Sequence, residues 1–226
     1  MNYKIIIDKD AMLEFIDGLP DLTVDEKYYF CLFGRKKYCK DIKYIKSDKT
    51  QLSRHVARKE RIFTKIQQME CELDAYTQGD TSIPQEAIAL YINPNPRCLR
   101  KAALEGLKKL ADVIALNAIG FDPQAELMSC IQRSISRKVW SDFDIDTKEE
   151  GTLEKVQDIL QDKNCYRILE SRGGYHILVE LSKIPEGIKK VWYKQLASLA
   201  DIQGDCMLPV PGSYCGGFTP KFIDIF

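Results

Sequence analysis

Three aspartates alternate along one stretch of this chain and are the residues best placed to do chemistry. Apolar and acidic positions alternate over Lys138–Asp146, which predicts a strand with Asp142, Asp144 and Asp146 on one face. Like charges this close repel, whereas a pair of Mg²⁺ or Mn²⁺ ions would neutralise them and accept their oxygens as ligands. Two such ions can bridge a triphosphate and stabilise a leaving pyrophosphate. A solvent-exposed acidic strand end or a calcium-like loop remains the alternative.

A glycine-containing turn and a histidine form the second motif. Ser171-Arg172-Gly173-Gly174 separates two short apolar segments, and His176 follows directly. In such a hairpin turn the backbone N–H groups, the Ser171 hydroxyl and the Arg172 guanidinium can surround phosphate oxygens, while the imidazole adds a donor. A single histidine on a strand is also compatible with a purely structural role.

The third motif supplies another acid near the end of the chain. Asp205 precedes a predicted strand at Met207–Val210 and could complete a set of metal ligands with the strand aspartates. Asp201 is the second choice for this role. Lys221 is a further candidate phosphate contact, and the intervening Pro211-Gly212 could simply reverse the chain.

The elements that position these motifs follow in a recognisable order. After the first strand, the apolar spacing predicts a helix at 153–160, strands at 166–170 and 175–181, a helix after Pro185, the strand at 207–210 and a further strand at 221–226. The order β-α-β-β-α-β is ferredoxin-like, or RRM-like, and predicts an α+β core over about 138–226. Right-handed crossovers place both helices on one face, leave the other face open and set the first strand beside the third. The aspartates would then lie next to His176 and near Asp205.

The chain before this core is predicted to be an α/β, helix-rich portion. We divide the sequence into an N-terminal portion, 1–130, and a catalytic core, 131–226. Local patterns predict strands at 3–7 and 88–92, a helix from Met12 and a helix within 51–69. A helix with Asn95 as N-cap should follow, with an apolar face formed by Leu99, Ala103, Leu107, Leu110 and Ile114.

Charge is balanced in total but uneven along the chain. The 226 residues include 33 basic and 33 acidic side chains, yet residues 35–65 carry twelve Lys or Arg against three acids. With Tyr38, Tyr44 and Phe63 interspersed, this basic segment could track a nucleic-acid strand by charge and stacking, or form a solvated helix face. No apolar run is long enough to span a membrane, so a cytoplasmic protein without a membrane partner is expected. The eight cysteines include no C-x-x-C pair and read as small buried side chains.

The three motifs together resemble the archaeo-eukaryotic primase superfamily. Asp142-Phe143-Asp144-Ile145-Asp146, Ser171 through His176, and Asp205 followed by Pro211-Gly212-Ser213 stand in that family's order. The resemblance covers about Lys138 to Lys221. It implies a primase or polymerase that joins nucleoside triphosphates on single-stranded or primer-template nucleic acid. It makes two strand aspartates and Asp205 metal ligands, in the register Asp142/Asp144 or Asp144/Asp146, and it makes Ser171, Arg172, Gly173 and His176 nucleotide contacts.

Departures from the family and two rival functions complete the expectations. No counterpart of a zinc-binding knuckle is visible, so no structural zinc is expected, and a separate protein could supply a helicase. A non-catalytic replication initiator module that binds single strands is one alternative, because the β-α-β-β-α-β order also serves RNA-recognition folds. A metal-dependent nuclease is the other, and its product would be a shortened strand.

Overall fold

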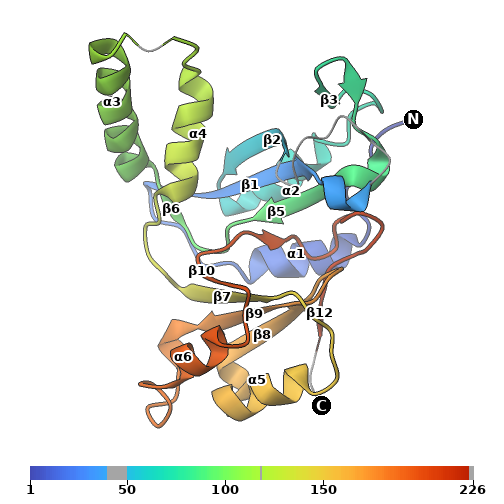
Figure 1. The fold of residues 1–226 in the computed structure, drawn as a ribbon, viewed down its shortest axis with the longest axis vertical. Coiled ribbons are helices and arrows are strands. Elements are labelled where there is room, and N and C mark those ends of the chain that lie inside the picture. The colour runs from blue at the N-terminus through green and yellow to red at the C-terminus, as the bar shows by residue number, and fades with distance from the viewer. Residues whose placement is uncertain (40–49, 118, 224–226) are drawn as a thin grey trace.

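The computed structural model describes residues 1–39, 50–117 and 119–223, and Figure 1 shows its helices and antiparallel sheets. The fold class is α+β, as predicted. The middle of the basic segment (40–49, with Tyr44) and the last three residues of the predicted final strand lie outside the described residues. No helix in the described ranges has the length and apolar character needed to cross a membrane.

The first sheet has the strand order β11-β5-β1-β2, with β6 also paired to β1. Its strands are β1 (Glu26–Gly34), β2 (Thr50–Ala57), β5 (Ile88–Ile92), β6 (Arg97–Cys98) and β11 (Leu208–Pro209). All but one residue of β1 is buried. A strand buried on both faces forms a continuous apolar run without alternation, which is why the sequence pattern predicts no strand there.

The predicted helix over 51–69 is wrong in its first half. Residues Thr50–Ala57 form β2, and only Lys59–Gln67 forms a helix, α2. Nearly the whole of β2 pairs with β1, from Ala57 opposite Tyr28 to Thr50 opposite Gly34. Pairing to a buried strand outweighs the weak helix preference of this segment.

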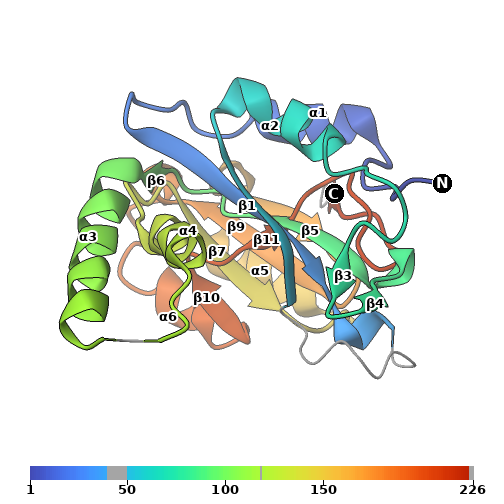
Figure 2. The ribbon, with the colours of Figure 1, turned by 90° about the horizontal axis from the view of Figure 1, so that it is seen from above.

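Two helices cover one face of this sheet. Helix α1 (Lys9–Asp17) begins behind Asp8, whose side chain accepts a hydrogen bond from the Ala11 backbone N–H at 3.0 Å. It lies beside α2 (Figure 2), and both pack apolar side chains against β1 and β5. The strand predicted at 3–7 is reduced to isolated bridges at Asn2 and Ile6.

A helical hairpin projects from the end of the first sheet (Figure 1). It consists of α3 (Leu99–Ala115) and α4 (Pro123–Arg133), the second of which the sequence analysis does not anticipate. The predicted N-cap is wrong, because α3 begins after Cys98 and Asn95 is buried elsewhere. The predicted apolar face is also not a core face, since Ala102 is the buried residue of α3.

The second sheet carries the predicted motifs and has the order β10-β7-β9-β8-β12. Its strands are β7 (Trp140–Ile145), β8 (Tyr166–Glu170), β9 (Tyr175–Glu180), β10 (Ile202–Gly204) and β12 (Lys221–Ile223). Strand β7 lies directly beside β9, as predicted. Helices α5 (Thr152–Leu160) and α6 (Trp192–Ala197) pack together on the face that contains Phe143 and Ile145.

The strand predicted at Met207–Val210 does not close this sheet. Its place beside β7 is taken by the earlier β10, whereas Leu208 and Pro209 form β11 and pair with β5 in the first sheet. The chain therefore crosses from the second sheet back to the first between 204 and 208. As a result, the sheet face that was expected to be open looks onto the first sheet.

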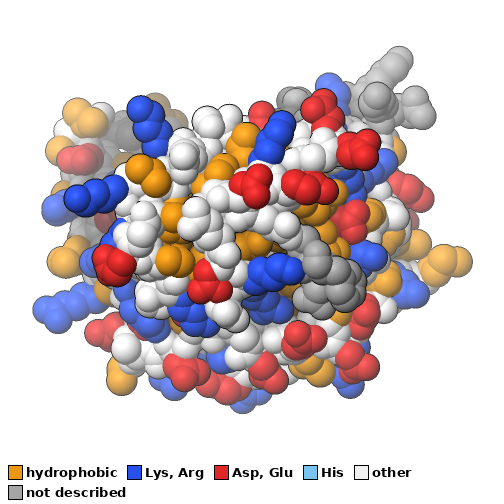
Figure 3. Space-filling view, turned by 90° about the horizontal axis from the view of Figure 1, so that it is seen from below, with side chains coloured by type: hydrophobic (Ala, Val, Ile, Leu, Met, Phe, Trp, Pro, Cys, Tyr) orange, Lys and Arg blue, Asp and Glu red, His pale blue; other side chains and the backbone are white. Residues whose placement is uncertain are grey.

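The remaining elements are short. They are the strands β3 (Thr77–Gln78) and β4 (Thr81–Ser82) and the 3₁₀ turns η1 (Lys36–Tyr38), η2 (Gln85–Ala87), η3 (Lys163–Cys165) and η4 (Leu181–Lys183). Figure 3 shows the molecule from below relative to Figure 1, on the side where α5 and α6 lie. Acidic and basic side chains are interspersed on this face. The acidic bias of the C-terminal half is therefore not gathered into one patch on this face.

Candidate functional site

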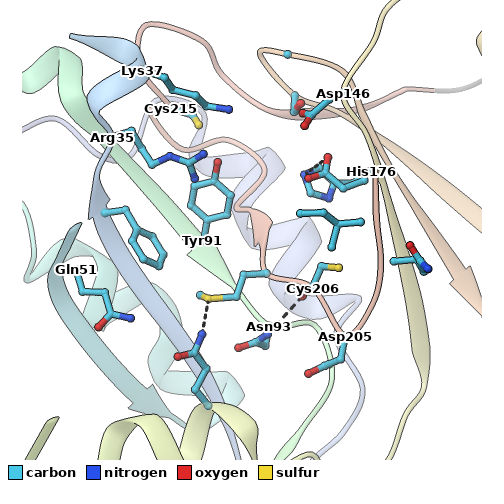
Figure 4. A pocket seen from close by; sticks show the side chains of 18 of the residues that line it. Arg35, Lys37, Gln51, Tyr91, Asn93, Asp146, His176, Asp205, Cys206 and Cys215 are labelled. Atoms are coloured by element: carbon cyan, nitrogen blue, oxygen red, sulfur yellow. Dashed lines mark hydrogen bonds and ion pairs between the residues drawn. The ribbon is translucent and has the colours of Figure 1, made fainter. Parts of the chain in front are cut away.

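A cavity of about 810 Å³ lies between the two sheets. Residues from both sheets and their loops line it, and each of the three predicted motifs contributes at least one of them (Figure 4). The lining comprises Phe33, Arg35, Lys37, Tyr38, Gln51, Tyr91, Asn93, Gln132, Arg133, Asp144, Asp146, Ser171, Gly173, His176, Ile202, Gln203, Asp205, Cys206, Met207 and Cys215. Ligand pockets for small molecules commonly have volumes of roughly 300–1,000 Å³, so this cavity can hold a nucleotide.

His176 is held between two of the strand aspartates. Its Nδ1 lies 3.0 Å from Asp142 Oδ2, and its Nε2 lies 3.5 Å from Asp144 Oδ1. Register explains this: Asp144 is directly opposite His176 on the paired strand, and Asp142 is one step further along the same face. Asp142 is 1% exposed and His176 4% exposed, so this pair is shielded from water.

Charge inside this cluster favours a protonated imidazole. Burial by itself lowers the pKa of His176, but the Asp142 carboxylate, followed by Asp144 and Asp146, raises the pKa above its ordinary value. Because Asp142 accepts from Nδ1, the other nitrogen is turned toward Asp144 and the cavity. A buried cation at this point can face an anionic ligand.

Asp144 and Asp146 line the cavity, whereas Asp142 lies behind His176. The pKa of Asp144 is raised, first by burial and then by repulsion from Asp146 and Asp142, against the attraction of His176 and Lys37. The site therefore disfavours a further negative charge unless a cation enters it. Of the two registers that the sequence permits, the geometry presents Asp144/Asp146 to the cavity.

The glycine-containing turn is rigid and lies against the end of β7. The Ser171 hydroxyl forms hydrogen bonds of 3.1 Å with the backbone of Gly174. The Ser171 backbone N–H donates to the Gly174 carbonyl at 2.9 Å. A Cβ added to Gly174 would lie 1.9 Å from the carbonyl oxygen of Ile145. This close approach, which only glycine permits, brings Ser171 and Gly173 to the cavity wall beside Asp146.

Two of the predicted phosphate contacts lie outside the cavity lining. Arg172 stacks on Tyr38, with its guanidinium carbon 4.7 Å from the ring centroid, and its Nη1 donates to the carbonyl of Gly216. Lys221, on β12, lies 3.9 Å from Glu170 at the edge of the second sheet. In this arrangement Arg172 joins the glycine turn to the C-terminal loop and to Tyr38, rather than facing a ligand.

Asp205 reaches the cavity, but both of its oxygens already have partners. Oδ2 lies 2.6 Å from Nη1 of the fully buried Arg97, and Oδ1 accepts from the Asn95 side chain at 2.9 Å. The second choice, Asp201, lies outside the lining and accepts from the backbone N–H of Asp146 at 2.8 Å. Asp201 is bonded to the backbone of both Asp144 and Asp146, yet neither it nor Asp205 forms a three-ligand group with them in the part of the chain that the structure describes.

Asn95 is the residue that holds these pieces together. Its side-chain oxygen accepts from the backbone N–H groups of Val139 and Trp140, both at 2.8 Å. Its amide nitrogen donates to the Trp140 carbonyl and to Asp205, both at 2.9 Å. One buried amide thus anchors the start of β7 and the Asp205 loop to the segment that precedes α3.

The carboxylates of the cavity fit only part of the ligand set that two divalent ions require. In the described ranges, no group of three or more His, Cys, Asp or Glu side chains is arranged to hold a metal ion. Mg²⁺, however, is usually bound through one or two carboxylates together with water and substrate phosphates. Asp144 and Asp146 meet that smaller requirement, because both line the cavity. Asp142 and Asp205 do not fit as ligands in this arrangement.

Two basic side chains, Arg35 and Lys37, lie opposite the carboxylates, and no sequence motif singles them out. Arg35 directly follows β1 and Lys37 lies in η1, and both line the cavity across from Asp146 and His176 (Figure 4). The Arg35 guanidinium carbon lies 5.2 Å from the Tyr91 ring centroid, which orients it. The basic segment marks both residues, but nothing in its sequence separates them from the ten other Lys and Arg side chains of residues 35–65.

Comparison of this chain with protein-family models, with curated proteins and with solved structures finds no match. Any functional assignment must therefore come from the chemistry of the cavity itself.

Proposed function

We propose that this protein is a metal-dependent nucleotidyltransferase of the primase-polymerase kind, which joins nucleoside triphosphates on a nucleic-acid template. One observation carries the proposal. Asp144 and Asp146 stand on one side of a nucleotide-sized cavity, Arg35 and Lys37 stand on the other, and a buried imidazole lies beside the carboxylates. Opposed acidic and basic walls suit a ligand that carries both phosphates and metal ions.

The topology of the second sheet supports the same reading. Its strands β10-β7-β9-β8 follow the order 4-1-3-2 when numbered along the β-α-β-β-α-β series, with each neighbouring pair antiparallel. That order is expected for an RRM-like core. The archaeo-eukaryotic primase superfamily, which the motifs resemble, combines this core with acids on the first strand and a histidine on the third.

Asp144 and Asp146 would hold the divalent ions, with phosphate and water oxygens as the other ligands. Mg²⁺ or Mn²⁺ bound there would neutralise phosphate charge and lower the pKa of the attacking 3′-hydroxyl. The ions are proposed from the donor chemistry and from the charge at Asp144.

The chain's own residues have separate tasks in this proposal. Arg35 and Lys37 bind triphosphate oxygens from the side of the first sheet. Asp142 fixes the ring of His176 and maintains its proton, so that Nε2 can donate to a phosphate oxygen. Ser171 and Gly173 form the wall of the cavity beside Asp146. Base choice would come from the template.

The two rival functions, a single-strand-binding module and a nuclease, predict different products in the same assay. A non-catalytic single-strand-binding module has no physical reason to keep two repelling carboxylates, Asp144 and Asp146, on the wall of a cavity. A nuclease would use similar ions but shorten the strand. Products on a sequencing gel therefore separate all three functions.

The experiment offers labelled ribo- and deoxyribonucleoside triphosphates, with Mg²⁺ or Mn²⁺, to the protein with a primed or an unprimed template. Incorporation should fall by at least about a hundredfold in Asp144→Asn and in His176→Ala, because each change removes a group aimed at the reacting phosphates. Asp158→Asn, an exposed acid of α5 on the opposite side of the sheet, is the matched control. Incorporation that survives both cavity variants refutes the proposal, and strand shortening or metal-independent binding without incorporation assigns the site to one of the rival functions.

A further inference from the structure

Helix α3 is the outermost element of the helical hairpin and turns one side to solvent. Figures 1 and 2 show it at the edge of the molecule, with α4 between it and the sheet. Of its 17 residues, Ala102 is the buried one. The cavity takes Gln132 and Arg133 from α4 and nothing from α3, so this helix is separate from the site described above.

The inward side of α3 is identified by its contacts with α4. Glu105 pairs with Arg133 at 2.9 Å, and Lys109 pairs with Glu126. A Cβ added to Gly106 would lie 3.2 Å from a methyl group of Leu127, which makes this glycine the point of close approach between the helices. The opposite side of α3 has no such partner among the described residues.

That opposite side carries an apolar stripe with the spacing of a helix–helix interface. Leu104, Leu107, Ala111 and Ile114 follow one another at intervals of three, four and three residues, and all are exposed. Leu104 is 56%, Leu107 63% and Ile114 75% exposed. These are the a and d positions of a heptad, and a small residue at a central position lets a second helix approach closely. A contiguous exposed stripe of this kind marks an interaction surface rather than an ordinary solvated face.

The charges that border the stripe determine which helix fits. Lys101 and Lys108 occupy successive e positions, with Ala103 and Leu110 at the g positions. Lys108 makes no ion pair within the described ranges, and Lys101 donates to the Ile135 carbonyl at 3.0 Å from an exposed position. In coiled coils the e and g side chains choose the partner by charge. These two lysines therefore favour a facing helix that carries acidic side chains at the matching positions.

A second copy of α3 does not supply those acids. In an antiparallel pair the e positions face one another, which would oppose Lys101 and Lys108 to the same lysines of the second copy. In a parallel pair they would face Ala103 and Leu110. Self-association thus gains no charge complementarity in either direction.

We propose that the outward face of α3 is the docking site for an amphipathic α-helix of a partner protein, whose apolar stripe is bordered by Asp and Glu. The Leu104–Ile114 stripe covers the partner's a and d side chains, and Lys101 and Lys108 pair with its acids. The same hairpin contributes Gln132 and Arg133 of α4 to the cavity lining, so a partner bound to α3 is attached to an element of the candidate site.

The test uses two designed three-heptad peptides with Leu at every a and d position, one with Glu and one with Lys at every e and g position. Binding of each fluorescein-labelled peptide to the full chain is followed by anisotropy at low and at moderate salt. The Glu peptide should bind the protein at least about tenfold more tightly than the Lys peptide, and its binding should weaken as salt rises.

Variants locate the surface. Leu107→Glu should weaken binding of the Glu peptide about tenfold or more, because it puts a charge into the apolar stripe. Lys108→Glu should weaken it as well and reduce the preference for the Glu peptide. Val24→Glu is the matched control, since it makes the same kind of change at an 83% exposed site outside the hairpin and should leave binding unchanged. Circular dichroism of each variant checks the fold, which changes at exposed positions should preserve.

Several outcomes overturn the proposal. Failure of both peptides to bind, or equal binding of the two, removes the charge-matched helix. Light scattering that shows a dimer dissociated by Leu107→Glu assigns the face to a second copy. Flotation with vesicles of neutral and anionic phospholipid that depends on Leu107 assigns it to a membrane surface instead.

Discussion

Replacing Asp144 with Asn should stabilise the protein when divalent ions are absent, although the same change abolishes the proposed activity. Asp144 lies on β7 and Asp146 follows the last residue of that strand, so their carboxylates are about 7 Å apart at a strand rise of ~3.3 Å per residue. Two charges at that distance repel by about 2.4 kcal/mol at an effective dielectric constant of 20, and by about 0.6 kcal/mol in water. The Asp144 side chain is 22% exposed, which places the repulsion between these limits, at about 1 kcal/mol.

The pKa of Asp144 is raised first by burial of its carboxylate and then by this repulsion, and the attraction to His176 and Lys37 does not cancel the two. The folded state binds the Asp144 proton more tightly than the unfolded state does. Stability is therefore lost as pH rises from the ordinary pKa of an aspartate through the raised value. Asp144→Asn should add about 1 kcal/mol at neutral pH, or about 2–4 °C in Tm for a chain of this size, and the gain should vanish at pH values below the ordinary aspartate pKa.

Divalent ions should make the wild type more stable than Asp144→Asn, which reverses the order of their Tm values. An ion present at about tenfold over its Kd stabilises the folded state by about 1.4 kcal/mol, so Mg²⁺ or Mn²⁺ should raise the Tm of the wild type more than that of Asp144→Asn. Thermal unfolding followed by circular dichroism, with EDTA and then with each ion, measures both effects. Asp158→Asn, the exposed acid on α5, should respond to the ions as the wild type does. A lower Tm for Asp144→Asn in EDTA, or an equal response of both proteins to the ions, would refute the reasoning.

Three further predictions concern the frame of the site. Gly174→Ala should cost about 2–3 kcal/mol in urea unfolding, because its Cβ would lie 1.9 Å from the Ile145 carbonyl, whereas Gly173→Ala, whose nearest atom is 3.9 Å away, should be nearly neutral. Asn95→Ala should cost about 3 kcal/mol, because it removes the side-chain partner of two partly buried backbone N–H groups and of a carbonyl. Burial would raise the pKa of Glu26, but hydrogen bonds from Thr23, Ser136 and Arg137 lower it to about 2. The stability contributed by ionised Glu26 is thus present above its ordinary pKa of 4.5 and lost as pH falls toward 2, so Glu26→Gln should cost about 2 kcal/mol at neutral pH and flatten the acid unfolding curve in that window.

Each of these has a result that contradicts it. Equal stabilities of the two glycine variants would mean that the turn does not lie against Ile145. For Asn95, the control is Asn164→Ala, whose side chain donates only to Asp162 on an exposed turn; a similar loss in both variants would remove Asn95 from the frame. Parallel acid unfolding curves for the wild type and Glu26→Gln would show that the carboxylate is not ionised below its usual range.

Local patterns in the sequence determined the elements that carry the motifs. Alternation over Lys138–Asp146, glycines between two short apolar segments and helical spacing over 153–160 each involve neighbours in the chain. They predicted β7, α5, β8 and β9 closely, and the crossover rule then placed β7 beside β9. Asp144 and His176 were consequently found together from sequence alone.

Tertiary structure decided which surfaces meet, because side-chain periodicity states that a face is apolar or charged but not what will cover it. Thr50–Ala57 became a strand only through pairing with β1, and the apolar stripe of α3 faces outward because α4 contacts its other side. Asn95 does not cap α3 but anchors the start of β7, and Arg97 forms an ion pair with the carboxylate of Asp205. Arg35 and Lys37 lie across the cavity from Asp144 and Asp146, although more than one hundred residues of chain separate the two pairs. Contacts over such sequence distances depend on long-range packing, which no local pattern encodes.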